Sequence, residues 1–80
     1  MRVRIYSLKG VLYEGEAAEI VARTTTGEIS VLAHHEPLVT MLTDSELRVV
    51  REGAEALSIP IRGGFLEVRP DNSVVVLAEE

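Results

Sequence analysis

The chain has 80 residues, of which 46% are hydrophobic and none is cysteine, so we expect one small domain over residues 1–80 with no disulfide or thiolate metal site. Its net charge of -5 and its scattered arginines argue against a nucleic-acid partner, because phosphate binding needs clustered Lys and Arg. No apolar stretch approaches the roughly 20 residues of a membrane span, and the start of the chain alternates like a strand rather than a signal peptide. We therefore expect no direct membrane insertion.

Polar and apolar residues alternate with a period of two through the first half of the chain, which predicts strands with one buried face. Such strands are expected over residues 2–6, 11–13, 18–23 and 28–32. Glycines that permit unusual backbone angles separate them, and we expect turns at Gly10, Gly15 and Gly27.

The second half of the chain continues the pattern. Residues 38–42 are apolar and predict a short buried strand, and the runs 47–52 and 56–61 predict a hairpin around Gly53. Pro60 suggests an edge strand, while Gly63 and Gly64 indicate a turn or a close approach of backbones. A last hairpin joins residues 65–69 to 74–78, and the unbroken run Val74 to Leu77 predicts a strand covered on both faces. Eight to ten short strands without a helix predict a sandwich or barrel.

Several apolar residues fall on the nominally polar phase of their strands. These residues are Val21, Leu32, Val50, Leu66 and Val68. They are either covered within the fold or exposed as a docking surface for another protein, and alternation does not distinguish the two. The same question applies to Phe65, the one phenylalanine, whose truncation would cost about 3–5 kcal/mol if the ring lies in the core.

No set of residues indicates catalysis or a cofactor. The chain has no nucleophile elbow and no glycine-rich phosphate loop, and Glu14, Glu16 and Glu19 fit a solvated face better than an acid-base pair. The segment His34-His35-Glu36 fits a recognition loop. A metal site there is the alternative hypothesis, although neighbouring side chains on an extended segment point in opposite directions and three protein ligands are usual.

Four stretches, in this order, resemble the N-terminal domain of the ATP synthase epsilon subunit. They are residues 10–16, 27–38, 47–59 and 63–72. The second is similar to the family signature Gly-Glu-x-Gly-x-x-Pro-Gly-His-x-Pro-Leu. The resemblance implies a flattened ten-stranded antiparallel β-sandwich. It also places the family's regulatory C-terminal helical hairpin beyond Glu80, so its regulation and ATP binding are not carried over to these residues.

The resemblance implies a non-catalytic rotor subunit of the central stalk, peripheral on the cytoplasmic face of the membrane. Its partners would be the gamma subunit and the polar loops of the c-ring, and no cofactor is implied. The ring-facing residues would be Glu28, Ser30, His34, His35, Glu36 and Pro37. Ala33-His34 replaces the Pro-Gly of the signature, which changes the turn chemistry, so we expect a loop of different shape. A free-standing adaptor with the same fold is the alternative function.

Overall fold

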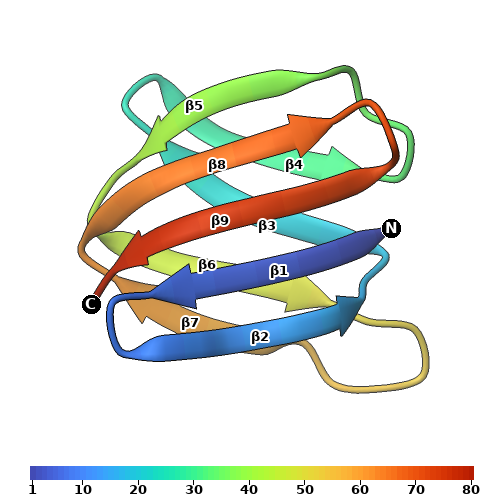
Figure 1. Ribbon diagram of the computed structural model, residues 1–80, viewed down its shortest axis with the longest axis horizontal. Helices are drawn as coiled ribbons and strands as arrows, with labels where there is room; N and C mark the ends of the chain where they lie inside the picture. Colours follow the sequence, from blue (N-terminus) through green and yellow to red (C-terminus); the bar gives the residue numbers. More distant parts are fainter.

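The computed structural model describes residues 1–80 and consists of nine β-strands joined by short turns (Figure 1). The strands are β1 (Arg2–Ser7), β2 (Gly10–Glu16), β3 (Glu19–Thr24), β4 (Gly27–Leu32), β5 (Leu38–Leu42), β6 (Ser45–Val50), β7 (Leu57–Ile61), β8 (Gly63–Arg69) and β9 (Ser73–Glu79). The alternation pattern predicted this all-β architecture, whereas the ten strands implied by the resemblance are not observed. No helix is present that could cross a membrane.

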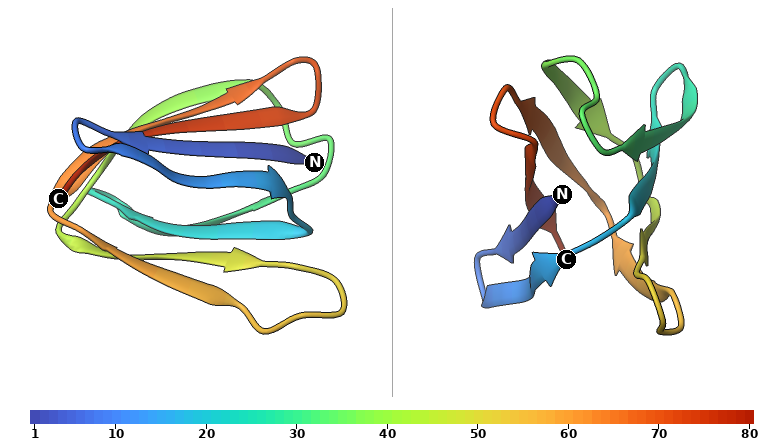
Figure 2. Two further views of the ribbon diagram at one scale, coloured as in Figure 1. Left: turned by 60° about the horizontal axis from the view of Figure 1, so that its bottom comes forward. Right: turned by 90° about the vertical axis from the view of Figure 1, so that its right-hand side faces the viewer.

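The strands form two layers that face each other (Figure 2). The first sheet has the order β2-β1-β9-β8-β5, and the second has the order β4-β3-β6-β7. A single residue pair, Thr24 of β3 with Leu42 of β5, links them through the backbone. The sandwich is therefore close to a closed barrel. The sandwich was expected to be antiparallel throughout, and this is wrong for one pair: β1 and β9 run parallel, with Arg2 opposite Ser73.

The chain changes sheets four times, namely between β2 and β3, β4 and β5, β5 and β6, and β7 and β8. The last two of these corners are neighbours, since Leu42 pairs with Gly64. At Thr43 and Asp44 it passes from β5 to β6, and at Arg62 it returns from β7 to β8. The amide of Thr43 donates to the carbonyl of Arg23 at 3.0 Å, and the amide of Arg62 donates to the carbonyl of Glu79 at 2.7 Å. These bonds satisfy backbone groups that a bend would otherwise leave unpaired.

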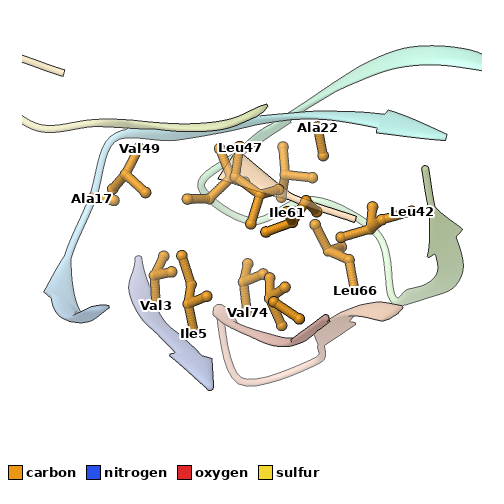
Figure 3. Close-up of a cluster of buried hydrophobic side chains, with 14 of the residues drawn as sticks. Val3, Ile5, Ala17, Ala22, Leu42, Leu47, Val49, Ile61, Leu66 and Val74 are labelled. Atoms are coloured by element: carbon orange, nitrogen blue, oxygen red, sulfur yellow. The ribbon is translucent and has the colours of Figure 1, made fainter. Parts of the chain in front are cut away.

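The core is aliphatic and lies between the two sheets (Figure 3). Its most deeply buried large side chains are Ile5, Ile20, Leu47 and Leu66. Leu66 and Val68 thus face the core, although their place in the alternation had suggested the polar phase. Their cross-strand partners on β9, Val76 and Val74, are buried with them, because residues paired across two strands share one face of the sheet.

Two strands expected to be covered on both faces are covered on one only. In β5, Val39 and Met41 are exposed while Leu42 is buried. In β9, Leu77 is exposed between the buried Val76 and Ala78. Both strands lie in the first sheet, and no second layer of this chain covers its outer face.

The predicted turn glycines occupy two kinds of position. Gly10 and Gly27 follow turns and begin strands with φ of 133° and 127°. Gly15 lies inside β2, so its assignment to a turn is wrong, whereas Gly63 begins β8 directly after the bend at Arg62 and Gly64 follows it. A close approach of backbones explains Gly64, since a Cβ there would lie 2.1 Å from the carbonyl oxygen of Leu77.

Candidate functional site

An apolar row crosses the outer face of the first sheet. Tyr6 of β1 pairs with Leu77 of β9, Leu77 pairs with Phe65 of β8, and Phe65 pairs with Met41 of β5. Phe65, Met41 and Leu77 are each at least half exposed, at 50%, 57% and 56%. Four strands therefore present one continuous line of apolar side chains to solvent.

A second row lies beside the first and widens it. Val39 of β5 and Val75 of β9 flank Glu67 of β8, whose carboxylate pairs with the guanidinium of Arg69 at 3.2 Å. We call the two rows together the apolar face. It consists of Tyr6, Val39, Met41, Phe65, Val75 and Leu77. Leu8, at the tip of the β1–β2 turn, is fully exposed and lines a hollow with Tyr6, Phe65 and Leu77.

The outer face of the second sheet has a different character. Arg23 of β3 pairs with Glu28 of β4 at 3.8 Å, and both side chains are mostly exposed. Val21 is half-buried between Ser30 and Arg48, its partners on either side. Charged and hydroxyl groups thus interrupt this face, which leaves the first sheet as the one with a continuous apolar surface.

The loop between β4 and β5 carries four of the predicted ring-facing residues. Its first turn is closed by a hydrogen bond from the amide of His35 to the carbonyl of Leu32, at 3.2 Å. His34 is the third residue of that turn and has a positive φ of 64°, whereas Ala33 does not. This is the pattern of a type II turn, which Pro-Gly favours. The turn therefore forms although Ala33 and His34 stand in place of that pair.

A side chain from another turn holds this loop. The amide of His34 donates to the Oδ1 atom of Asn72 at 2.7 Å, across 38 residues of sequence. Asn72 lies in the β8–β9 turn and itself has a φ of 61°. Sequence reasoning missed this residue, and the one signal available was an Asn in a predicted turn, where positive φ is tolerated.

The other predicted ring-facing residues lie elsewhere on the molecule. Glu28 and Ser30 are exposed on the outer side of β4, and roughly 13 Å of strand separates Glu28 from the start of the loop at Leu32. The structure therefore does not gather the predicted residues into one cluster. His35, Glu36 and Pro37 are exposed in the loop, and the Nδ1 atom of His35 lies 2.7 Å from the carbonyl of Glu36.

The titratable groups show no convergence on a common point. No three His, Asp or Glu side chains come together in a way that could hold a metal ion, so the metal hypothesis for His34 and His35 finds no support. One pKa is shifted. The Ser73 hydroxyl donates to the Asp71 carboxylate at 2.5 Å and holds the pKa of Asp71 below its usual value of 3.8. That bond stabilises the β8–β9 turn.

A β-sandwich with an apolar row on its outer face and an exposed end loop has features typical of protein-binding domains. The whole chain, residues 1–80, matches the family model described as "ATP synthase, Delta/Epsilon chain, beta-sandwich domain". The chain belongs to this family.

Individual relatives agree with that assignment. The ATP synthase epsilon chain of Brevibacillus brevis is 39% identical over 79 residues, which cover 99% of this chain and 59% of the relative. The ATP synthase epsilon chain of Mycobacterium avium is 42% identical over 80 residues, which cover 99% of this chain and 65% of the relative. The chain thus spans about three fifths of the length of these relatives.

Solved structures show the same fold. A chain of the mitochondrial ATP synthase of Euglena gracilis, in a complex of OSCP, F1 and c-ring, superposes with a TM-score of 0.91 at 30% identity, covering 98% of this chain and 49% of that chain. A chain from the central stalk and c-ring of the Tetrahymena thermophila enzyme has a TM-score of 0.86 at 14% identity, covering 100% of this chain and 63% of that chain. The second likeness concerns the fold alone.

Proposed function

We propose that this chain is the docking domain of a non-catalytic rotor subunit in an F-type ATP synthase. The apolar face binds the gamma subunit, and the β4–β5 loop with the outer side of β4 meets the polar loops of the c-ring. The domain thereby couples rotation of the ring to rotation of gamma, as a peripheral part of the complex at the cytoplasmic face of the membrane. The apolar face is the observation that carries this proposal, together with membership in the family.

The apolar face would form the centre of a permanent contact. Obligate interfaces bury roughly 2,000 Å² or more in total, or about 1,000 Å² on each partner. The whole chain exposes 4921 Å², so such a contact would cover about one fifth of it. The apolar face crosses four of the five strands of the first sheet and would form the apolar centre of such a contact, with the polar residues around it forming the rim.

A coupling element must also resist deformation. Of 45 backbone hydrogen bonds, 39 lie within the strands, so few backbone groups depend on turns and loops alone. The corners at Thr43 and Arg62 are themselves hydrogen-bonded, which resists sliding of one sheet over the other. A close-packed body of this kind transmits force between two surfaces.

The second surface is polar and acidic. Glu36 and Pro37 are exposed in the β4–β5 loop, and Glu28 lies on the outer side of β4. These carboxylates suit basic groups on the ring loops. Contacts of this type give modest affinity in water, so the ring contact depends on geometry more than on a single ion pair.

The gamma contact is tested with paired variants. Phe65→Ala together with Leu77→Ala should lower the affinity for purified gamma at least about tenfold, because truncating apolar anchors at the centre of an interface commonly costs more than 1 kcal/mol each. Arg48→Ala with Ser58→Ala, on the outer face of the second sheet, is the matched control and should leave affinity unchanged. Equal effects of the two pairs would contradict the assignment of the apolar face.

The ring contact is tested separately. Glu28→Ala with His35→Ala should weaken binding to detergent-solubilised c-ring, or to the gamma–ring complex, while the melting temperature stays within a few degrees, since both side chains are exposed and surface changes are usually within about 0.5 kcal/mol. Unfolding of this variant would mean that the residues are structural. A free-standing adaptor would bind neither gamma nor the ring.

A further inference from the structure

The β4–β5 loop has one hydrogen bond that ties it to a distant part of the chain. Within the loop, the amide of His35 closes the turn on Leu32 and the His35 ring meets the carbonyl of Glu36. Only the amide of His34 reaches outside, to the Oδ1 atom of Asn72 at 2.7 Å. Asn72 is thus the one distant side chain that holds the turn at the start of this loop.

The same residue, His34, carries the strain of the turn. Its φ of 64° lies in the left-handed region, which residues with a Cβ adopt at a cost in energy. The hydrogen bond uses the amide of this very residue, so it stabilises the strained conformation directly. A Pro-Gly pair would adopt this turn without help, whereas Ala33-His34 lacks both the fixed φ and the permissive residue.

Asn72 is well suited to act as the acceptor. It also has a left-handed φ, 61°, and its own carbonyl accepts from the amide of Arg2 at 3.3 Å. The residue is therefore fixed between the start of β1 and the loop. Asn and Asp combine a short side-chain acceptor with tolerance of positive φ, which few other residues do.

We propose that Asn72 is the positioning residue of the β4–β5 loop. Its side-chain carbonyl holds the turn at His34 and so presents Glu36 and Pro37 to the polar loops of the c-ring. This inference rests on the ring contact proposed above. The β8–β9 turn makes no ring contact in that proposal, but through Asn72 it contributes to the affinity for the ring.

Three variants separate the acceptor from the backbone angle. Asn72→Gly keeps the left-handed φ and removes the acceptor, while Asn72→Asp keeps both. Arg69→Ala, which removes a nearby charge on β8, controls for changes to this hairpin that leave Asn72 intact. Amide hydrogen exchange of His34 in the folded protein reports the bond, and loss of one hydrogen bond should speed it about fivefold. Exchange at the core residue Leu66 should not change.

Binding to the detergent-solubilised c-ring without gamma supplies the second readout, because Arg69 pairs with Glu67 on the face proposed to bind gamma. We expect Asn72→Gly to weaken ring binding several-fold, Asn72→Asp to restore it, and Arg69→Ala to leave it unchanged. Unchanged exchange at His34 in Asn72→Gly would overturn the proposal, and so would faster exchange without weaker ring binding. The double variant Glu28→Ala, His35→Ala shows whether a negative result concerns Asn72 alone or the ring contact as a whole. If it still weakens ring binding, only the role of Asn72 is wrong, and if it does not, the ring contact itself is wrong.

Discussion

Replacement of Gly64 by alanine tests how tightly the corner between the sheets is built. Gly64 is the second residue of β8, directly after the chain returns from the second sheet at Arg62. Its φ is 141°, and a Cβ would lie 2.1 Å from the carbonyl oxygen of Leu77 and 3.1 Å from the Cα of Ala78. Both contacts are with backbone, so no side-chain rotation can relieve them.

The expected loss has two parts. A non-glycine residue at this φ costs about 1–3 kcal/mol, and the overpacking that moves β9 away costs a further 1–3 kcal/mol or so. A domain of this length has about 4–12 kcal/mol of stability in total. The sum of about 4 kcal/mol therefore removes a third or more of it, and should lower the melting temperature by roughly 15 °C or more.

Two other glycines separate these contributions in thermal melts followed by circular dichroism. Gly10→Ala meets nothing within 4 Å at a φ of 133°, so it should show the backbone cost alone. Gly63→Ala meets only ordinary contacts, 3.4 Å from the carbonyl of Leu42, and should change the melting temperature little. If Gly64→Ala melts no lower than Gly10→Ala, the close approach to β9 contributes nothing and the explanation of this glycine is wrong.

Three further predictions concern the loop, the β8–β9 turn and the core. His34→Gly should raise the free energy of unfolding by about 0.5 kcal/mol, since relief of the left-handed strain exceeds the added entropy of the unfolded chain. A lower free energy of unfolding, measured by urea denaturation, would contradict it. The folded-state pKa of Asp71 lies below 3.8, so its carboxylate contributes stability above that pH and loses the contribution as pH falls through the folded-state pKa. Ser73→Ala removes the hydrogen bond and should therefore make stability fall less steeply with acid, as measured by urea midpoints between neutral pH and pH 3. Leu66→Ala should cost about 2–5 kcal/mol, and Phe65→Ala should cost clearly less in the absence of gamma because its ring is half exposed; equal melting temperatures would contradict this contrast.

The strands could be predicted from sequence because a half-buried strand imposes its own period on the residues. Apolar residues repeat at every second position in Val3 and Ile5, and again in Leu57, Ile59 and Ile61. They lie in the strands expected of them. The hairpin around Gly53 and Pro60's place on an edge strand were confirmed for the same local reason.

The sequence misassigned the faces of β5, β8 and β9. In β5 and β9 both phases carry apolar residues, so period two gives little contrast. In β8, Phe65 shares its phase with Glu67 and Arg69, and its large apolar ring made that phase look like the core-facing one. The pairing of β8 with both β5 and β9 decides which face Phe65 occupies, because it places Phe65 in line with Met41 and Leu77 on the outer side. The register between these strands therefore determines which residues form the apolar face.

The candidate ring-facing loop shows the same limit. Its residues could be located from a signature, but the bond from His34 to Asn72 joins two turns that are far apart in the sequence. Glu28 and His35, close in the sequence, lie at different places on the molecule because β4 is extended between them.

By itself the sequence determined the class of fold, the strands, most of the core and the family, because these depend on local periodicity and on ordered motifs. Only the tertiary structure decided which apolar residues are covered, where the backbones of β8 and β9 meet too closely for a side chain at Gly64, and which turn holds the loop. Those properties arise from pairing between distant segments, and the period of a single strand does not say which strand is its partner.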